Sequence, residues 1–133
     1  MQLAFLRAGF RLAGLLRPDV AVARAGRLFS TPMRGTRQRA LQSPDGGAAC
    51  GGFDMDGHRI ATYAWGDPAI QPYVLFAHGW SSHGTRFLPW IPRLREAGYA
   101  VVAFDQPAHG RSDGQRTTLP DFACTLFAVA RHF

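Results

Sequence analysis

The chain has 133 residues, of which 47% are hydrophobic and 12% aromatic, and its formal net charge is +6. This composition can bury a core, which indicates a globular rather than a disordered chain, and the length predicts one domain. The charge is uneven, because residues 1–40 hold eight arginines and one acid whereas residues 41–133 hold seven arginines and eight acids. The larger part is therefore near neutral, and we predict no nucleic-acid partner.

The amino-terminal segment predicts two short helices separated by Pro18-Asp19. Apolar residues recur at helical spacing, with arginines on another side, and the helical pattern resumes from Val20 to Phe29. No apolar run reaches the roughly 18 residues that span a bilayer, and no clear cleavage site follows, so neither a transmembrane segment nor a secretory signal is predicted. One alternative stays open, in which residues 1–40 associate weakly with a membrane surface.

A turn-rich stretch follows these helices. Met33 to Gln42 is polar and basic, and we interpret it as a solvated edge strand that leads to a turn cluster at residues 43–47. Residues 53–55 and 59–65 flank Asp56-Gly57, a dipeptide that favours a type I′ turn because both of its positions need a positive φ. The sequence therefore predicts an antiparallel hairpin.

Two apolar runs predict buried strands of a parallel sheet. Tyr73–Ala77 and Tyr99–Phe104 are separated by a helical pattern that ends at Gly98, a natural C′ residue. Strand, helix and strand form one βαβ unit, and the hairpin before it implies a mixed sheet that is antiparallel at one edge. We therefore predict an α/β fold preceded by amino-terminal helices, with ligands bound at the carboxyl ends of the parallel strands.

The last predicted element is a helix that begins near Thr118. Thr118 and Asp121 have the spacing of a capping box, Pro120 suits a first turn, and the buried face would comprise Phe122, Leu126 and Val129. The two cysteines, Cys50 and Cys124, match no metal-ligand or redox spacing. We interpret them as free thiols of a reducing compartment, which predicts a cytoplasmic location.

The loops after the two parallel strands carry the most specific signal. His78-Gly79 follows the first strand directly, and the second is followed by Asp105-Gln106-Pro107-Ala108-His109-Gly110-Arg111-Ser112. The second loop is similar to the Asp-x-Pro-Gly-His-Gly-x-Ser loop of the α/β-hydrolase superfamily. With the hairpin and the spacing of the loops, the chain over residues 50–130 resembles the amino-terminal half of a serine hydrolase. Ala108 replaces the usual glycine, so we expect a slightly less kinked loop.

The resemblance implies roles for the loop residues. The Trp80 backbone N–H would be one oxyanion-hole donor, presented by a loop that Gly79 and His78 shape. The active-site mouth would also be lined by Ser81, Ser82 and His83. The residues of the second loop look like scaffolding that hydrogen-bonds one loop to its neighbour, namely Asp105, His109, Gly110 and Ser112.

The catalytic groups themselves are not predicted within these residues. We identify no nucleophile elbow, which is Gly-x-Ser-x-Gly on a strand-to-helix turn. The resemblance implies that the serine, the acid and the histidine would lie beyond Phe133. His78 and His83 lack a third metal ligand, and neither a metal nor a cofactor is predicted.

These features predict a basic helical lead-in over residues 1–42 and a truncated hydrolase domain over residues 43–133. The complete enzyme would act on a small-molecule ester, thioester or amide. Ser81 stands where epoxide hydrolases and haloalkane dehalogenases usually carry proline, which favours acyl hydrolysis. We expect the chain alone to be poorly soluble and inactive, because Tyr73–Ala77 would be a bare sheet edge. The alternative is a non-catalytic, hydrolase-like binding protein.

Overall fold

A computed structural model describes residues 2–133, with side chains from Leu3 onward. It divides the chain into two compact units, Met1–Thr31 and Pro32–Phe133. The first unit contains α1 (Gln2–Leu16) and α2 (Pro18–Ser30), as the helical spacing predicts. None of its described side chains from Leu3 to Thr31 is buried. None of the described helices is both long enough and apolar enough to cross a membrane.

The second unit is built on a four-stranded mixed sheet. Its strands are β1 (Ala49–Met55), β2 (His58–Trp65), β3 (Tyr73–Ala77) and β4 (Ala100–Phe104), in the order β1-β2-β4-β3. β1 and β2 form the antiparallel hairpin, β2 pairs antiparallel with β4, and β3 pairs parallel with β4. The predicted mixed sheet with an antiparallel edge is therefore confirmed.

The hairpin turn has the backbone conformation that its dipeptide predicts. Asp56 and Gly57 have φ values of 51° and 77°, so both central residues are left-handed as a type I′ turn requires. From Ile60 to Trp65 β2 is largely buried on both faces, because Ile60 belongs to the core layer on one side of the sheet and Tyr63 to the layer on the other.

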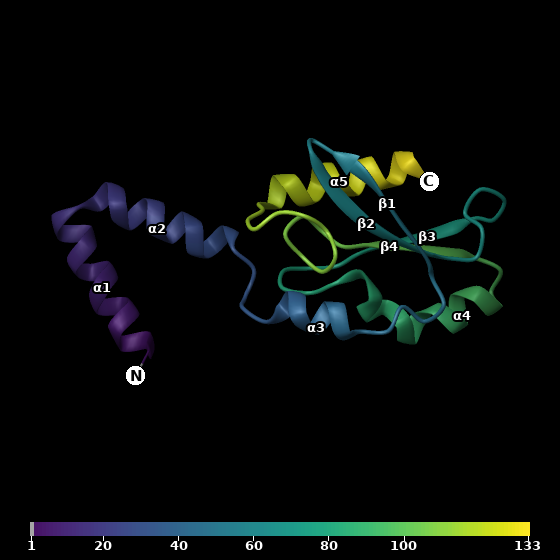
Figure 1. The fold of residues 1–133 in the computed structure, drawn as a ribbon, viewed down its shortest axis with the longest axis horizontal. Coiled ribbons are helices and arrows are strands. Elements are labelled where there is room, and N and C mark those ends of the chain that lie inside the picture. The colour runs from purple at the N-terminus through teal and green to yellow at the C-terminus, as the bar shows by residue number, and fades with distance from the viewer. Residues whose placement is uncertain (1) are drawn as a thin grey trace. The chain divides into compact units, whose positions relative to one another are not determined.

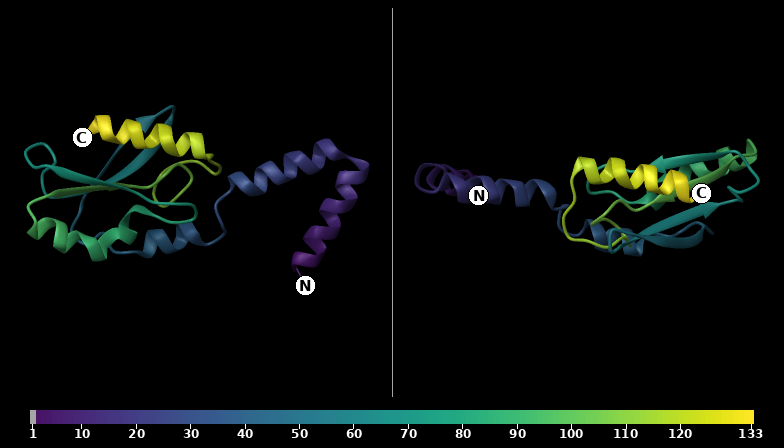
Figure 2. Two further views of the ribbon diagram at one scale, coloured as in Figure 1. Left: turned by 180° about the vertical axis from the view of Figure 1, so that it is seen from behind. Right: turned by 90° about the horizontal axis from the view of Figure 1, so that it is seen from above.

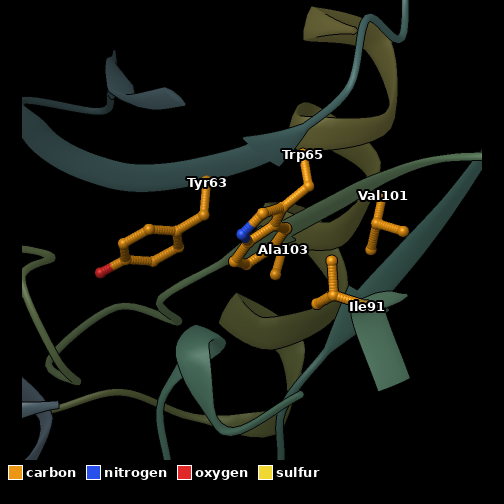
Figure 3. Packing of buried hydrophobic residues seen from close by; sticks show 5 residues of the cluster. All are labelled: Tyr63, Trp65, Ile91, Val101 and Ala103. Atoms are coloured by element: carbon orange, nitrogen blue, oxygen red, sulfur yellow. The ribbon is translucent and has the colours of Figure 1, made fainter. Parts of the chain in front are cut away.

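Helices cover the two faces of the sheet (Figures 1 and 2). One face packs against η1 (Gly84–Trp90), a 3₁₀-helix, and α4 (Ile91–Glu96); its buried residues are Tyr63, Trp65, Ile91, Val101 and Ala103 (Figure 3). The other face packs against α5 (Leu119–His132), with Ile60, Val102, Phe104 and Val129 buried. β4 is fully buried because its alternate side chains enter both layers.

The helix boundaries follow local signals in the sequence. Gly98 has φ = 86° and lies directly after the C-cap Ala97, while the Tyr99 N–H donates to the Leu94 carbonyl at 3.0 Å, which closes α4. Thr118 and Asp121 form the predicted capping box of α5, in which each side chain binds the other residue's N–H.

The edge strand predicted within Met33–Gln42 is wrong, because this segment contains α3 (Thr36–Gln42). Gly35 adopts φ = 78° at the N-cap and turns the chain into the helix. Thr36 and Ala40 are buried four residues apart on one helical side, while the intervening arginines stay exposed. Arginine, glutamine, alanine and leucine are also good helix formers.

Candidate functional site

The loops after β3 and β4 lie side by side at one end of the sheet. β3 and β4 are parallel neighbours, and their last residues, Ala77 and Phe104, are partners in the register. We call residues 78–84 the β3 loop and residues 105–117 the β4 loop. Both loops therefore lie at the carboxyl ends of parallel strands, where open parallel sheets bind their ligands.

Three hydrogen bonds join the two loops. The Gln106 N–H donates to His78 Nε2 at 2.9 Å, and the Ser81 N–H donates to His109 Nε2 at 2.9 Å. The Gly84 N–H donates to Asp105 Oδ1 at 2.7 Å. Each bond crosses from one loop to the other. The β3 loop is therefore joined to the β4 loop at its start through the His78 ring, and at its middle and end through the backbone N–H groups of Ser81 and Gly84.

Asp105 links the β4 loop to the sheet as well. Its Oδ2 accepts from the Tyr63 hydroxyl at 2.7 Å and from the Arg111 N–H at 2.8 Å, and the residue is only 1% exposed. Desolvation raises the pKa of Tyr63, and the Asp105 charge raises it further, so the phenol stays protonated and donates. A buried carboxylate with three donors is well compensated for its lost hydration.

His78 and His109 act as neutral acceptors in this arrangement. In each ring Nε2 accepts a backbone N–H, so the proton lies on Nδ1, which donates to the carbonyl of Gly79 or Pro107. Burial lowers the pKa of His78 to about 4 and also lowers the pKa of His109, which keeps both rings uncharged near neutral pH. Both nitrogens of His78 are thus engaged within the protein.

Four rings pack together at the same end of the sheet. Trp80 stacks on Phe122 of α5 with centroids 5.6 Å apart, and His109 meets both rings edge-on at 5.5 and 5.4 Å. His78 lies 5.2 Å from His109. The β3 loop, the β4 loop and the first turn of α5 therefore share one aromatic cluster.

Close backbone approach requires glycine at two positions beside Asp105. A Cβ on Gly84 would lie 2.9 Å from the Phe104 carbonyl oxygen, and a Cβ on Gly110 would overlap the Asp105 carboxylate. Ala108 adopts φ = 65°, so the expected relaxation of the kink at this residue does not occur. Its N–H donates to the Asp113 carbonyl at 2.7 Å, which holds the left-handed turn closed despite the Cβ.

The remaining residues of the β3 loop have partners within the second unit. Ser81 has φ = 54°, and its Oγ accepts the Met33 N–H at 2.9 Å. Ser82 is buried, and its Oγ accepts from the Arg86 guanidinium at 3.0 Å. His83 Nδ1 lies 2.9 Å from Thr85 Oγ1, and burial lowers its pKa.

One run of residues matches the sequence pattern of a nucleophile elbow, and it was not identified in the sequence analysis. Gly110-Arg111-Ser112-Asp113-Gly114 spells Gly-x-Ser-x-Gly. It lies within the β4 loop, not on a strand-to-helix turn, and Ser112 is 1% exposed. The Ser112 hydroxyl donates to the Asp105 carbonyl at 2.6 Å and accepts the Ala61 N–H at 2.9 Å. Ser112 thus cannot reach a substrate.

No serine hydroxyl has a histidine nitrogen as its hydrogen-bond partner within residues 2–133. The hydroxyls of the five serines instead bond to backbone groups or to arginine, at positions 30, 43, 81, 82 and 112. An activated serine needs an adjacent base. The described chain therefore contains no assembled serine–histidine pair.

Sequence reasoning missed three contributors to these loops. Tyr63 was recognised only as a strand residue, and Phe122 only as part of a buried helix face. The Arg37 guanidinium of α3 donates to the carbonyls of Ser112 and Gly114, which ties α3 to the β4 loop. Alternation along β2 could have suggested that Tyr63 points inward, but nothing local indicates its partner.

Comparisons with known proteins agree with the fold of the second unit. Residues 68–127 match the family of serine aminopeptidases, S33. A monoacylglycerol lipase of Mycolicibacterium smegmatis is 37% identical over 71 residues, which are 52% of this chain and 25% of the lipase. The thioesterase domain from the curacin biosynthetic pathway superposes with a TM-score of 0.60 at 27% identity, covering 65% of this chain and 32% of that domain.

The sheet, the paired loops and these matches together identify the fold of the second unit. The second unit carries part of an α/β-hydrolase fold. It is similar to one monoacylglycerol lipase and to one thioesterase domain, and the chain spans about a quarter to a third of the length of these two relatives.

Proposed function

We propose that this chain supplies the oxyanion side of a serine hydrolase site that acts on a small-molecule ester, thioester or amide. The observation that carries the proposal is that the β3 loop is joined to the β4 loop by hydrogen bonds that the side chains of His78, His109 and Asp105 accept. A donor stabilises a developing negative charge best when it is already oriented, because no reorganisation is then needed during the reaction. The Trp80 backbone N–H, which follows Gly79, is the donor we assign.

The acyl chemistry is supported by two independent features. The similar proteins are a lipase and a thioesterase, whose names denote cleavage of acyl bonds. Ser81 occupies the position where the hydrolases with an aspartate nucleophile usually carry proline. A tetrahedral intermediate of acyl transfer places its oxyanion against backbone N–H donors, which is the role of the β3 loop in this proposal.

The attacking serine, its histidine base and the orienting acid come from outside these 133 residues in this proposal. In this proposal Ser81 and His83 line the mouth of the site, and the buried Ser82 is held by Arg86 and does not line it. The other loop is positioned by Asp105, His109, Gly110 and Ser112. The isolated chain accordingly hydrolyses nothing. Incubation with p-nitrophenyl butyrate and with a fluorophosphonate probe is expected to give neither turnover nor labelled serine. Labelling of Ser81, Ser82 or Ser112 would contradict this assignment.

The role of the Trp80 backbone N–H is tested in a chimera that supplies the catalytic serine, histidine and acid. Residues 68–127 replace the matching segment of the mycobacterial monoacylglycerol lipase, and hydrolysis of a monoacylglycerol is measured. Tryptophan at position 80 is then replaced by its α-hydroxy acid, which exchanges the N–H for an oxygen without changing the side chain. Loss of one oxyanion donor should lower kcat about 10²- to 10³-fold.

The matched control places the same α-hydroxy acid at Trp90, which is 64% exposed and lies at the end of η1. We expect this change to leave kcat within about twofold, because one lost backbone bond mainly affects stability. A chimera that folds by circular dichroism but has no activity before substitution contradicts the proposal. Such a result would favour the alternative of a hydrolase-like protein that only binds its ligand.

A further inference from the structure

The first unit exposes an unusual amount of apolar surface. Ten large hydrophobic side chains between residues 3 and 29 are exposed by 38% to 84%, including Phe5 at 71%, Leu15 at 84% and Val22 at 72%. None of the described side chains in this unit is buried. Many large apolar side chains exposed in one unit point to an interaction site.

On each of α1 and α2, one group of exposed apolar side chains lies on a different side from the arginines. Phe5, Leu12 and Leu16 share one side of α1, while Arg7 and Arg11 lie on another. On α2, the exposed Val22 and Phe29 are seven residues apart and share one side, whereas Arg24 and Arg27 lie on another. Both helices are therefore basic and amphipathic.

The positive charges of this unit have little compensation within it. Five arginines face a single acid, Asp19, which lies 3.4 Å from Arg17 in an exposed ion pair. Arg24 lies over the ring of Phe10 at 5.5 Å. In the described part of the chain, Arg7, Arg11 and Arg27 have no carboxylate within 4.0 Å. An anionic partner would complement this charge.

We propose that Met1–Thr31 docks on an anionic lipid surface, with its apolar sides in the headgroup–acyl boundary and its arginines on the lipid phosphates. The helices would lie in the plane of the interface. α1 has 15 residues, which at about 1.5 Å per residue is shorter than the roughly 30 Å hydrocarbon core. It also carries two arginines near its middle. Helices with one apolar and one arginine-rich side bind interfaces in this way.

Two other occupants fit the surface less well. A nucleic acid would neutralise the arginines but would leave Phe5, Leu12 and Leu15 in water. A second copy would cover apolar surface but would bring five arginines of one unit near five of another. A lipid surface satisfies both kinds of side chain at once. This inference is independent of the proposed hydrolase site.

The test is flotation of the full 133-residue chain with vesicles through a density gradient. Vesicle-bound protein rises, whereas aggregated protein sinks, so poor solubility does not imitate binding. We expect flotation with vesicles of phosphatidylcholine and phosphatidylglycerol, and at least tenfold less with phosphatidylcholine alone. Raising the salt to about 0.15 M should weaken the electrostatic part of the binding.

Three double variants separate the contributions of charge and of apolar surface to vesicle binding. Arg7→Gln with Arg11→Gln should weaken partitioning roughly 25-fold, at about fivefold for each arginine. Arg7→Lys with Arg11→Lys should retain binding. Phe5→Ser with Leu12→Ser should weaken it roughly tenfold or more. The matched controls, Arg93→Gln with Arg116→Gln and the single change Ile70→Ser, alter exposed residues of the second unit and should change nothing.

Several results would overturn the proposal. Equal flotation with neutral vesicles would show that the arginines do not select the partner. Failure to float with anionic vesicles, together with a dimer in sedimentation velocity, would assign the apolar surface to a second copy. Displacement from vesicles by an equal charge of mixed-sequence duplex DNA would assign the site to nucleic acid. Unchanged binding of the Phe5 and Leu12 variant would exclude docking through α1.

Discussion

A single buried carboxylate at Asp105 connects three parts of the fold. It accepts hydrogen bonds from Tyr63 of β2, from Gly84 at the end of the β3 loop and from Arg111 of its own loop. In Asp105→Asn, the amide nitrogen must replace one acceptor oxygen and face a donor. We expect the free energy of unfolding to fall by about 3 kcal/mol, measured by urea titration of tryptophan fluorescence at submicromolar concentration.

Asp113 offers a matched control for this substitution. It is exposed, and its carboxylate accepts one hydrogen bond, from the Arg59 N–H at 3.0 Å. Asp113→Asn retains an acceptor oxygen for that donor, so the expected loss is below about 1 kcal/mol. Equal losses in the two variants would show that the Asp105 network contributes no more than a surface contact.

The neutral ring of His78 predicts a dependence of stability on pH. Burial lowers the pKa of His78 from its usual 6.5 to about 4 in the folded chain. Between these values the unfolded chain binds more protons than the folded chain, so stability falls as the pH is lowered from about 7 to about 4. The loss from this residue amounts to at most about 3 kcal/mol. The lowered pKa values of His109 and His83 act in the same direction.

The pH effect of His78 is isolated by comparing how steeply the free energy of unfolding changes with pH in the parent chain and in variants. His78→Asn keeps an acceptor near the Gln106 N–H but removes the titrating ring, so its unfolding free energy should change less with pH than that of the parent chain. His58→Gln alters an exposed histidine of the hairpin and serves as the control. If His78→Asn keeps the parent slope between pH 7 and 4, the ring does not titrate as its burial implies.

At the scale of elements, local patterns predicted the sheet well. Tyr73–Ala77 matches β3, and the second strand differs from β4 only by Tyr99, because short apolar runs with clear turns admit little else. The Asp56-Gly57 turn fixed the hairpin register, since its two positive φ values leave one way to pair the arms. The type and position of these strands can therefore be predicted from their own local sequence.

The misread α3 shows what local patterns leave out. Residues 36–42 have no apolar stripe, and only Thr36 and Ala40 are buried. Arg37 of the same helix donates to two carbonyls of the β4 loop, far away in the sequence. A helix held by small residues and one long-range cation leaves almost no periodic trace, so its type could not be predicted from hydrophobicity.

The candidate site was partly predictable for the same reason. His78, Gly79, Asp105 and His109 stand in short motifs directly after strands, so their positions followed from the motifs and the parallel sheet. The hydrogen-bond partners within the site could not be predicted in this way. The two histidines accept N–H groups from residues 28 positions away in the sequence. Tyr63 donates to Asp105, which is 42 positions away. No local sequence pattern contains contacts of this length.

At the scale of the whole molecule, the sheet has an unprotected side at β3. Within the described residues β3 pairs only with β4, and its side chains are half-buried from Tyr73 to Phe76. Unpaired N–H and C=O groups along an apolar strand are a template for another strand. The expected poor solubility of the isolated chain follows from this edge.

A charge on the edge should therefore improve solubility. Val74 is half-buried and belongs to neither core cluster, so Val74→Lys can place its ammonium group in water and discourage pairing at modest cost. We expect a higher soluble fraction after expression and less light scattering on concentration. Ile70→Lys adds the same charge at a residue that is 81% exposed and outside the sheet. Because it leaves the edge unchanged, it should help much less. Equal improvement in both variants would assign the effect to net charge, and the bare strand would not then explain the aggregation.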